Sequence, residues 1–271
     1  MKNRGIPFAL GSAFLLGLTP IFGKLAIQQG LDAIAVVALR TLGAAILLTL
    51  ILAVFQRSYF YIFPLGLAGC LIAGALNGIG SLFFYAGLAR IDASLGQLLY
   101  TLYPIWVAIL LYLDGQQPSK ITLLRLGLSI PGVYLITQVG TGFTNWQGVI
   151  FMCTASLLYA IHIPINQRVL FEVPTPTVTL YTLLAMTAIV VPAWLLIPPH
   201  DLSIPTGSLW PVIGLTLATF LARLLLFAGV KTIGGIQTSI FGLAELIVTV
   251  ILAVGILGER LSFQQWFGAV I

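Results

Sequence analysis

Four charged side chains lie inside long apolar runs of this 271-residue chain, and they are its clearest candidates for chemistry. They are Lys24, Arg40, Arg223 and Glu245. A charge inside a membrane costs at least about 2.5 kcal/mol on insertion scales, so such a residue usually faces a cavity or a partner. We therefore expect these side chains to mark a site for a polar ligand or a transported ion.

Arg223 and Glu245 are predicted to lie at the same depth in consecutive helices. Arg223 precedes Lys231 by eight residues, and Glu245 follows Gln237 by eight. At about 1.5 Å of rise per residue, both lie roughly 12 Å from the same membrane face. Pairing would reduce the cost of burying both charges. The sequence leaves two interpretations open: a static brace of the helix hairpin, or a site that opens to substrate or proton.

Uncommon polar residues share helical faces with these charges or lie in neighbouring segments. Such side chains either line a wet cavity or make hydrogen bonds between helices, and both uses are common in membrane bundles. The candidates for substrate binding or coupling are Glu245, Arg223, His162, Arg40, Asn77, Tyr103, Tyr100, Tyr159, Ser81 and Thr219.

Lys24 is a weaker candidate because it lies close to the end of its apolar run. Its long side chain is expected to extend to the membrane interface, toward Asp32. Arg40 lies about two turns inside the next run, at a depth that favours a cavity or gate.

Prolines and glycines mark where these helices bend or touch. Pro20, Pro104 and Pro164 fall inside apolar runs, where a missing amide hydrogen permits a kink. Gly74 and Gly78 form a Gly-x-x-x-Gly step, which suits close contact with another helix.

The composition indicates an integral membrane protein. Hydrophobic residues make up 59% of the chain and charged residues only 7%, against about 25% charged residues in soluble domains. The net charge of +5 comes from residues at the ends of apolar runs, so no nucleic acid partner is expected. No P-loop, Gly-x-Ser-x-Gly or His-Glu-x-x-His motif is present. With two cysteines and two histidines, we predict no catalytic residues, no metal site and no cofactor.

Nine apolar segments are long enough to span a bilayer, which needs roughly 20 residues. A tenth segment begins at Phe263 and stops at Ile271. The nine segments are Ile6–Gln28, Ala33–Phe55, Phe63–Ala89, Leu95–Leu113, Ile121–Val139, Trp146–Asn166, Thr177–Ile197, Leu209–Val230 and Ile236–Leu257.

An internal repeat relates the two halves of the chain at an offset of about 142 residues. Three pairs of short segments agree on this offset in order, which is stronger than any one match. The pairs are 84–91 with 226–233, 114–119 with 257–262, and 123–130 with 264–271.

The repeat predicts an all-α fold of ten transmembrane helices in two five-helix halves, 1–140 and 145–271. Because five is odd, the second half enters the membrane from the opposite side, as in many secondary transporters. The offset places Arg223 on Ser81 and Glu245 on Tyr103. The second half would end near residue 280, so the tenth helix is expected to be truncated and the chain to be a fragment.

The basic residues indicate the orientation. With the N-terminus inside, seven basic residues lie at inner helix ends and two at outer ends. Basic residues favour the cytoplasmic side. We therefore predict a plasma (inner) membrane protein whose N-terminus is cytoplasmic.

The end of the second half carries the most specific motif in the chain. The Glu245 segment leads into Gly-Glu-Arg-Leu-Ser at 258–262 and Gln-Trp-Phe-Gly-Ala at 265–269. In this, and in the basic residues Lys24 and Arg40, the chain resembles the EamA-like transporters of the drug/metabolite transporter superfamily. It departs from their pattern at Gln116, which replaces a glutamate, and at Arg223.

The resemblance implies a transporter of small metabolites, often an exporter, with a central cavity between the two halves. We expect secondary active transport by alternating access, with an anionic or zwitterionic substrate such as an amino acid, and a proton as a candidate coupling ion. The alternatives are a membrane-embedded lipid-modifying enzyme, and a channel or non-transporting membrane protein.

Overall fold

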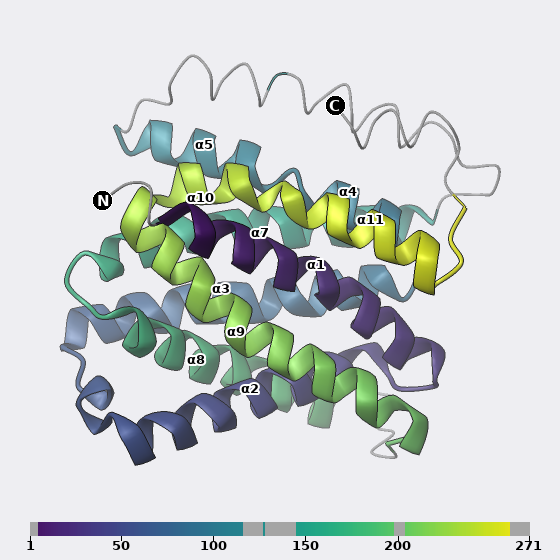
Figure 1. Ribbon diagram of the computed structural model, residues 1–271, viewed down its shortest axis with the longest axis horizontal. Helices are drawn as coiled ribbons and strands as arrows, with labels where there is room; N and C mark the ends of the chain where they lie inside the picture. Colours follow the sequence, from purple (N-terminus) through teal and green to yellow (C-terminus); the bar gives the residue numbers. More distant parts are fainter. Residues whose placement is uncertain (1–4, 116–126, 128–144, 198–203, 261–271) are drawn as a thin grey trace.

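The computed structural model describes residues 5–115, 127, 145–197 and 204–260 (Figure 1). This part of the chain is helical, with two short 3-10 turns, η2 (Arg57–Phe60) and η3 (Thr206–Ser208). The helices of the first half are α1 (Gly5–Gln28), α2 (Ala33–Phe55), α3 (Pro64–Leu88), α4 (Ala93–Tyr100) and α5 (Tyr103–Leu113). Those of the second half are α7 (Trp146–Leu170), α8 (Thr175–Leu196), α9 (Leu209–Ile233), α10 (Gly235–Gly242) and α11 (Ala244–Ile256).

Eight spans in the described residues are long and apolar enough to cross a membrane. Five are single helices, one joins η3 to α9, and two are joined from the short helices α4 with α5 and α10 with α11. Large apolar side chains remain exposed along these spans, as at Phe14, Leu50, Leu71, Ile213 and Ile251. Water would not tolerate so many of them, but lipid tails do. The predicted class is confirmed: the chain is an all-helical integral membrane protein.

Two of the predicted segments are interrupted rather than continuous. The segments predicted over Leu95–Leu113 and Ile236–Leu257 each consist of two helices. Helices α4 and α10 have eight residues each, and they begin 142 residues apart, at the offset of the internal repeat. The predicted fifth and tenth segments lie outside the described residues.

One end of the bundle, here called the Gly5 face, is where α1 begins. Gly5 lies against Ile233 at the end of α9. Lys231 donates from Nζ to the carbonyl of Val173, just after α7, at 3.0 Å. The Gly5 face therefore holds the start of α1 together with the ends of α7 and α9.

The opposite end, here called the Gln28 face, is where α1 ends. Lys24 donates from Nζ to the carbonyls of Leu88 at 2.7 Å and Ile91 at 2.8 Å. The expected contact with Asp32 is wrong, because that carboxylate caps α2 instead, and the free carbonyls at the end of α3 attract the cation. Gly148, near the start of α7, also lies against Ile91. Helices α1 and α7 therefore run in opposite directions.

Contacts between the halves occur in matched pairs. Helix α1 packs on α9 as α7 packs on α3, and α1 meets α11 as α7 meets α5. Figure 1 shows α1 lying between α11 and α9, so a helix of the first half packs between two helices of the second half. The largest buried cluster mixes both halves, with Ala26 and Leu88 beside Met152 and Leu215. The two halves thus build the buried interior jointly rather than each forming its own core.

Gly74 lets α3 approach α8 closely. A Cβ at Gly74 would lie 2.5 Å from the Cβ of Ala185 and 2.6 Å from the carbonyl oxygen of Thr182. Backbone atoms cannot move aside as a flexible side chain can. Only glycine allows α3 this contact, in the close-packing role that Gly-x-x-x-Gly steps serve in membranes.

Gly74→Ala is expected to destabilise the protein by about 1–3 kcal/mol, because overpacking forces α3 and α8 apart. Thermal unfolding in detergent measures this effect. Gly255→Ala is the matched control, since a Cβ there meets nothing within 4 Å. Equal melting temperatures for the two variants would contradict the packing.

Candidate functional site

The two helix breaks lie against each other. The first separates α4 from α5 at Thr101 and Leu102, before Pro104, whose ring nitrogen has no hydrogen to donate. The second separates α10 from α11 at Leu243. Gly242 ends α10 so close to the hydroxyl of Tyr103 that a Cβ there would overlap it. Glycine at this position lets the two breaks touch.

Glu245 lies in the first turn of α11, directly after the second break. The side chain of Tyr103, the first residue of α5, donates to its Oε1 at 3.2 Å. Gln97 of α4 donates from Nε2 to Oε2 at 3.3 Å. Glu245 is only 2% exposed, and the amino end of a helix favours a negative charge. Two neutral donors from the first half therefore hold a carboxylate of the second half.

Arg40 also connects the two halves through hydrogen bonds. Its guanidinium donates to Ser81 of α3 at 3.0 Å and to Thr219 of α9 at 3.2 Å. Its Cζ also lies 4.9 Å from the centre of the Tyr85 ring, a cation–π distance. The sequence grouped Arg40, Ser81 and Thr219 among the site candidates, and the structure joins them directly.

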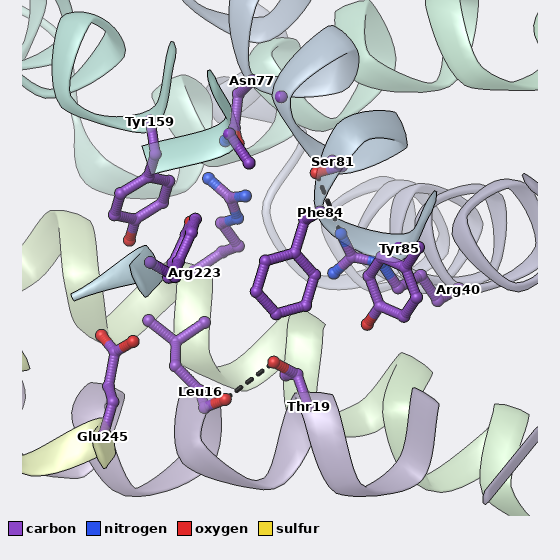
Figure 2. A pocket seen from close by; sticks show the side chains of 13 residues that line it. Leu16, Thr19, Arg40, Asn77, Ser81, Phe84, Tyr85, Tyr159, Arg223 and Glu245 are labelled. Atoms are coloured by element: carbon purple, nitrogen blue, oxygen red, sulfur yellow. Dashed lines mark hydrogen bonds between the residues drawn. The ribbon is translucent and has the colours of Figure 1, made fainter. Parts of the chain in front are cut away.

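Arg223 does not form the predicted ion pair with Glu245. No salt bridge between the two occurs in the described part of the chain, and Figure 2 shows the Arg223 guanidinium turned toward Asn77 and away from Glu245. Both residues line one cavity, which agrees with their predicted similar depth in the membrane. Depth along a helix does not determine how that helix is rotated about its axis. In the structure, Tyr103 and Gln97 already donate hydrogen bonds to the Glu245 carboxylate.

A cavity of about 40 Å³ lies between these side chains (Figure 2). Seven of the ten predicted site residues line it: Arg40, Asn77, Ser81, Tyr100, Tyr159, Arg223 and Glu245. Tyr103 and Thr219 lie one hydrogen bond behind the lining. The volume suffices for water-sized molecules and is far below the roughly 300–1,000 Å³ of typical ligand pockets.

Both halves of the chain match one family model. The EamA-like transporter family matches residues 3–138 and again residues 146–271. The chain belongs to the EamA-like transporter family. Membership makes it a transporter-family protein and not an enzyme, and the two matched regions correspond to the two halves of the fold.

The other comparisons bear on this EamA-like protein only through its fold. No curated protein matches the chain. A solved structure titled "Crystal structure of protein" is similar to it, with 15% identity and a TM-score of 0.72. That match covers 100% of this chain and 94% of the other. At such low identity the likeness shows a shared fold alone.

His162 does not line the cavity of this EamA-like protein. Its ring lies 4.6 Å from that of Tyr159 and also contacts Phe227. Its Nδ1 bonds to the carbonyl of Tyr159, and Asn166 donates to the carbonyl of His162 at 3.0 Å. Of Tyr159, His162 and Asn166 on α7, only Tyr159 reaches the lining.

Several lining residues were absent from the predicted site. Phe84 and Tyr85 cover one side of the cavity, and Thr19 of α1 contributes from below (Figure 2). Aromatic side chains in an apolar segment carry no signal that separates a cavity wall from a packed core. Thr19 bonds to the carbonyl of Leu16 in its own helix, as many buried threonines do.

Glu259, from the family motif, ties the halves together at the Gln28 face. Its carboxylate accepts hydrogen bonds from the amides of Ala93 at 2.7 Å and Ser94 at 3.0 Å, and from the Ser94 hydroxyl at 2.6 Å. These amides are free at the start of α4, so a residue of the second half caps a broken helix of the first. At the Gly5 face, the start of α10 is capped by Gln167, which accepts from Gly235 at 2.6 Å.

Tyr103→Phe is expected to lower the free energy of unfolding by about 1–3 kcal/mol, because the buried Glu245 carboxylate loses one of its two donors. Denaturation in detergent checks this. Tyr112→Phe, at an exposed position on α5, serves as the control and should leave stability unchanged. Equal stabilities for the two phenylalanine variants would show that the Tyr103 bond is not made.

Glu259→Ala is expected to cost about 1–2 kcal/mol, since three donors at the start of α4 lose their acceptor. Glu172→Ala removes an exposed carboxylate after α7 and should change stability little. Hydrogen exchange of the Ala93 and Ser94 amides is the sharper measurement. Unchanged protection in Glu259→Ala would contradict the cap.

Proposed function

We propose that the protein is a secondary active transporter that exports small polar metabolites by alternating access. The observation that carries this is the charged cavity, enclosed by both halves at the meeting point of two helix breaks. Interrupted helices expose backbone and helix ends at midmembrane depth, where many secondary transporters bind their substrates. A cavity of about 40 Å³ cannot hold a metabolite, so the halves must separate on one side before a substrate binds.

The wider architecture proposed is ten helices in two inverted five-helix repeats, with domains 1–140 and 145–271. The opposite directions of α1 and α7 support this, as do the matched contacts between halves. We also propose a plasma (inner) membrane location with a cytoplasmic N-terminus. Arg57, Arg168 and Lys231 follow or end helices at the Gly5 face, and cytoplasmic ends are rich in such residues.

The charges of the cavity support an anionic or zwitterionic substrate, such as an amino acid. Two guanidinium groups and one carboxylate line it, those of Arg40, Arg223 and Glu245. Lys24 does not add to this charge, because its side chain binds carbonyls at the Gln28 face. The lining therefore keeps a cationic excess of one.

Glu245 is the proposed coupling residue, with a proton as the coupling ion. It is buried, it lies at the junction of the halves, and Tyr103 and Gln97 bind it from the other half. Gain or loss of a proton would change these two hydrogen bonds, because a protonated carboxyl becomes a donor as well as an acceptor. Protonation at this point thus acts on the contact between the halves.

Glu245→Gln is expected to abolish proton-coupled uptake while keeping most of the local hydrogen bonding. In proteoliposomes, wild-type uptake of the substrate amino acid should depend on the imposed pH gradient, and the variant should lose at least about tenfold in rate, as when a general acid–base group is removed. Counterflow, which needs no net proton movement, should survive better. Glu172→Gln is the exposed control. Unchanged uptake with unchanged pH dependence would remove Glu245 from the mechanism.

A further inference from the structure

Arg223 is a buried cation without a hydrogen-bonding or ionic partner among the described residues. It is 4% exposed, and its Nε and Nη1 make no hydrogen bond within the described structure. No carboxylate of that part of the chain lies within salt-bridge distance. A buried charge is normally paired and hydrogen-bonded, because its desolvation is otherwise uncompensated. The guanidinium therefore requires an acceptor that the described residues do not supply.

A second donor without a partner lies next to it. Asn77 of α3 is 3% exposed, and its Nδ2 has no hydrogen-bond partner in the described residues. Figure 2 shows the Arg223 guanidinium reaching toward Asn77 at the edge of the cavity that both residues line. A guanidinium offers only donors and an amide nitrogen offers two more. This corner of the cavity presents donors to a missing acceptor.

The internal repeat explains why this corner differs from its counterpart. The offset of 142 relates Asn77 to Thr219 and Ser81 to Arg223. Ser81 of α3 and Thr219 of α9 both accept from Arg40. The repeat maps this pair onto Arg223 of α9 and Asn77 of α3, and nothing in the described protein accepts from their side-chain nitrogens. The protein itself therefore supplies a hydrogen-bond partner to the first pair but not to the second.

The carboxylate in the lining is already engaged. The Glu245 carboxylate accepts from Tyr103 and Gln97, and it lies away from the Arg223 guanidinium (Figure 2). The oxygens without a partner in the described lining, the hydroxyls of Tyr85 and Tyr159, are neutral and do not balance the charge of Arg223.

We infer that Arg223 and Asn77 form an oxyanion subsite, which binds the carboxylate or phosphate group of the transported molecule. This rests on the proposed transport function. The planar guanidinium fork matches two oxygens of either group, and Asn77 supplies a further donor. Arg40, whose two terminal nitrogens donate to Ser81 and Thr219, adds positive charge to the same cavity. The required substrate feature is an anionic headgroup, and an amine is neither necessary nor sufficient.

Binding to the purified protein tests the subsite with three probes that differ in headgroup. Phenylacetate carries a carboxylate, phenyl phosphate a phosphate and phenethylamine only an amine. The phenyl group suits the aromatic wall formed by Phe84 and Tyr100. At least one anionic probe should raise the melting temperature of the wild type, and the amine should not. Whichever anion gives the larger shift identifies the oxyanion. Stabilisation by the amine alone would overturn the inference.

Two variants address the Arg223 side chain itself. Arg223→Met should weaken anion binding roughly 10- to 100-fold, as expected for lost charge-assisted hydrogen bonds. It should also raise the melting temperature of the ligand-free protein by at least about 2 °C, since an unpaired buried charge is removed. Asn77→Asp places a carboxylate beside the guanidinium, so it should likewise stabilise the free protein and block the anion. Arg168→Met, on the surface of α7, is the matched control and should keep wild-type binding.

The outcomes separate this inference from the proposed function. Full anion binding by both Arg223→Met and Asn77→Asp would overturn the subsite, even if wild-type proteoliposomes transport. A wild type that binds an anion through Arg223 but shows no counterflow of any anion would support the subsite and contradict transport. A destabilised Arg223→Met with unchanged binding would assign Arg223 to structure alone.

Discussion

The structure depends on how a membrane interior accommodates a carboxylate. Glu245 lies where two interrupted helices meet, and its charge is held by Tyr103 and Gln97 of the opposite half. Each half alone would leave a costly unpaired group in a low-dielectric interior. The contact therefore requires both halves, and it places the most polar point of the protein at the junction on which any relative movement must act.

The same constraint explains the shape of the surrounding site. Gly242 has no side chain where Tyr103 approaches, and Pro104 interrupts the helix that delivers Tyr103. Arg40 spans α3 and α9 through two hydroxyl groups, so its charge is dispersed over both halves. At the Gln28 face, Glu259 caps α4 across the same boundary. Arg40, Glu245 and Glu259 thus each bind across the boundary between the halves.

Much of this was predictable because burying charge in a membrane is so costly. The apolar segments identified the spans, and the isolated charges identified most of the cavity lining. The repeat related Glu245 to Tyr103, and in the structure the two side chains form a hydrogen bond. Hydropathy missed both helix breaks, since an interrupted helix has the same composition as a continuous one. Pro104 signalled the first break, whereas Leu243 carries no comparable signal.

The pairing of Arg223 with Glu245 could not be settled by sequence. Residue spacing fixes depth along a helix axis, but a salt bridge also depends on rotation and on competing donors. Tyr103 of α5 and Gln97 of α4 are such competing donors, and both helices belong to the other half of the chain. Likewise, Phe84 and Tyr85 look the same in sequence whether they fill a core or cover a cavity.

The central claim is that Glu245 and Tyr103 interact directly and hold the two halves together. A double-mutant cycle measures this interaction, using the unfolding free energies of the wild type, Tyr103→Phe, Glu245→Gln and the double variant. The structure predicts a coupling energy of about 0.5–3 kcal/mol, as residues sharing a hydrogen bond show. Additive effects within about 0.3 kcal/mol would contradict it.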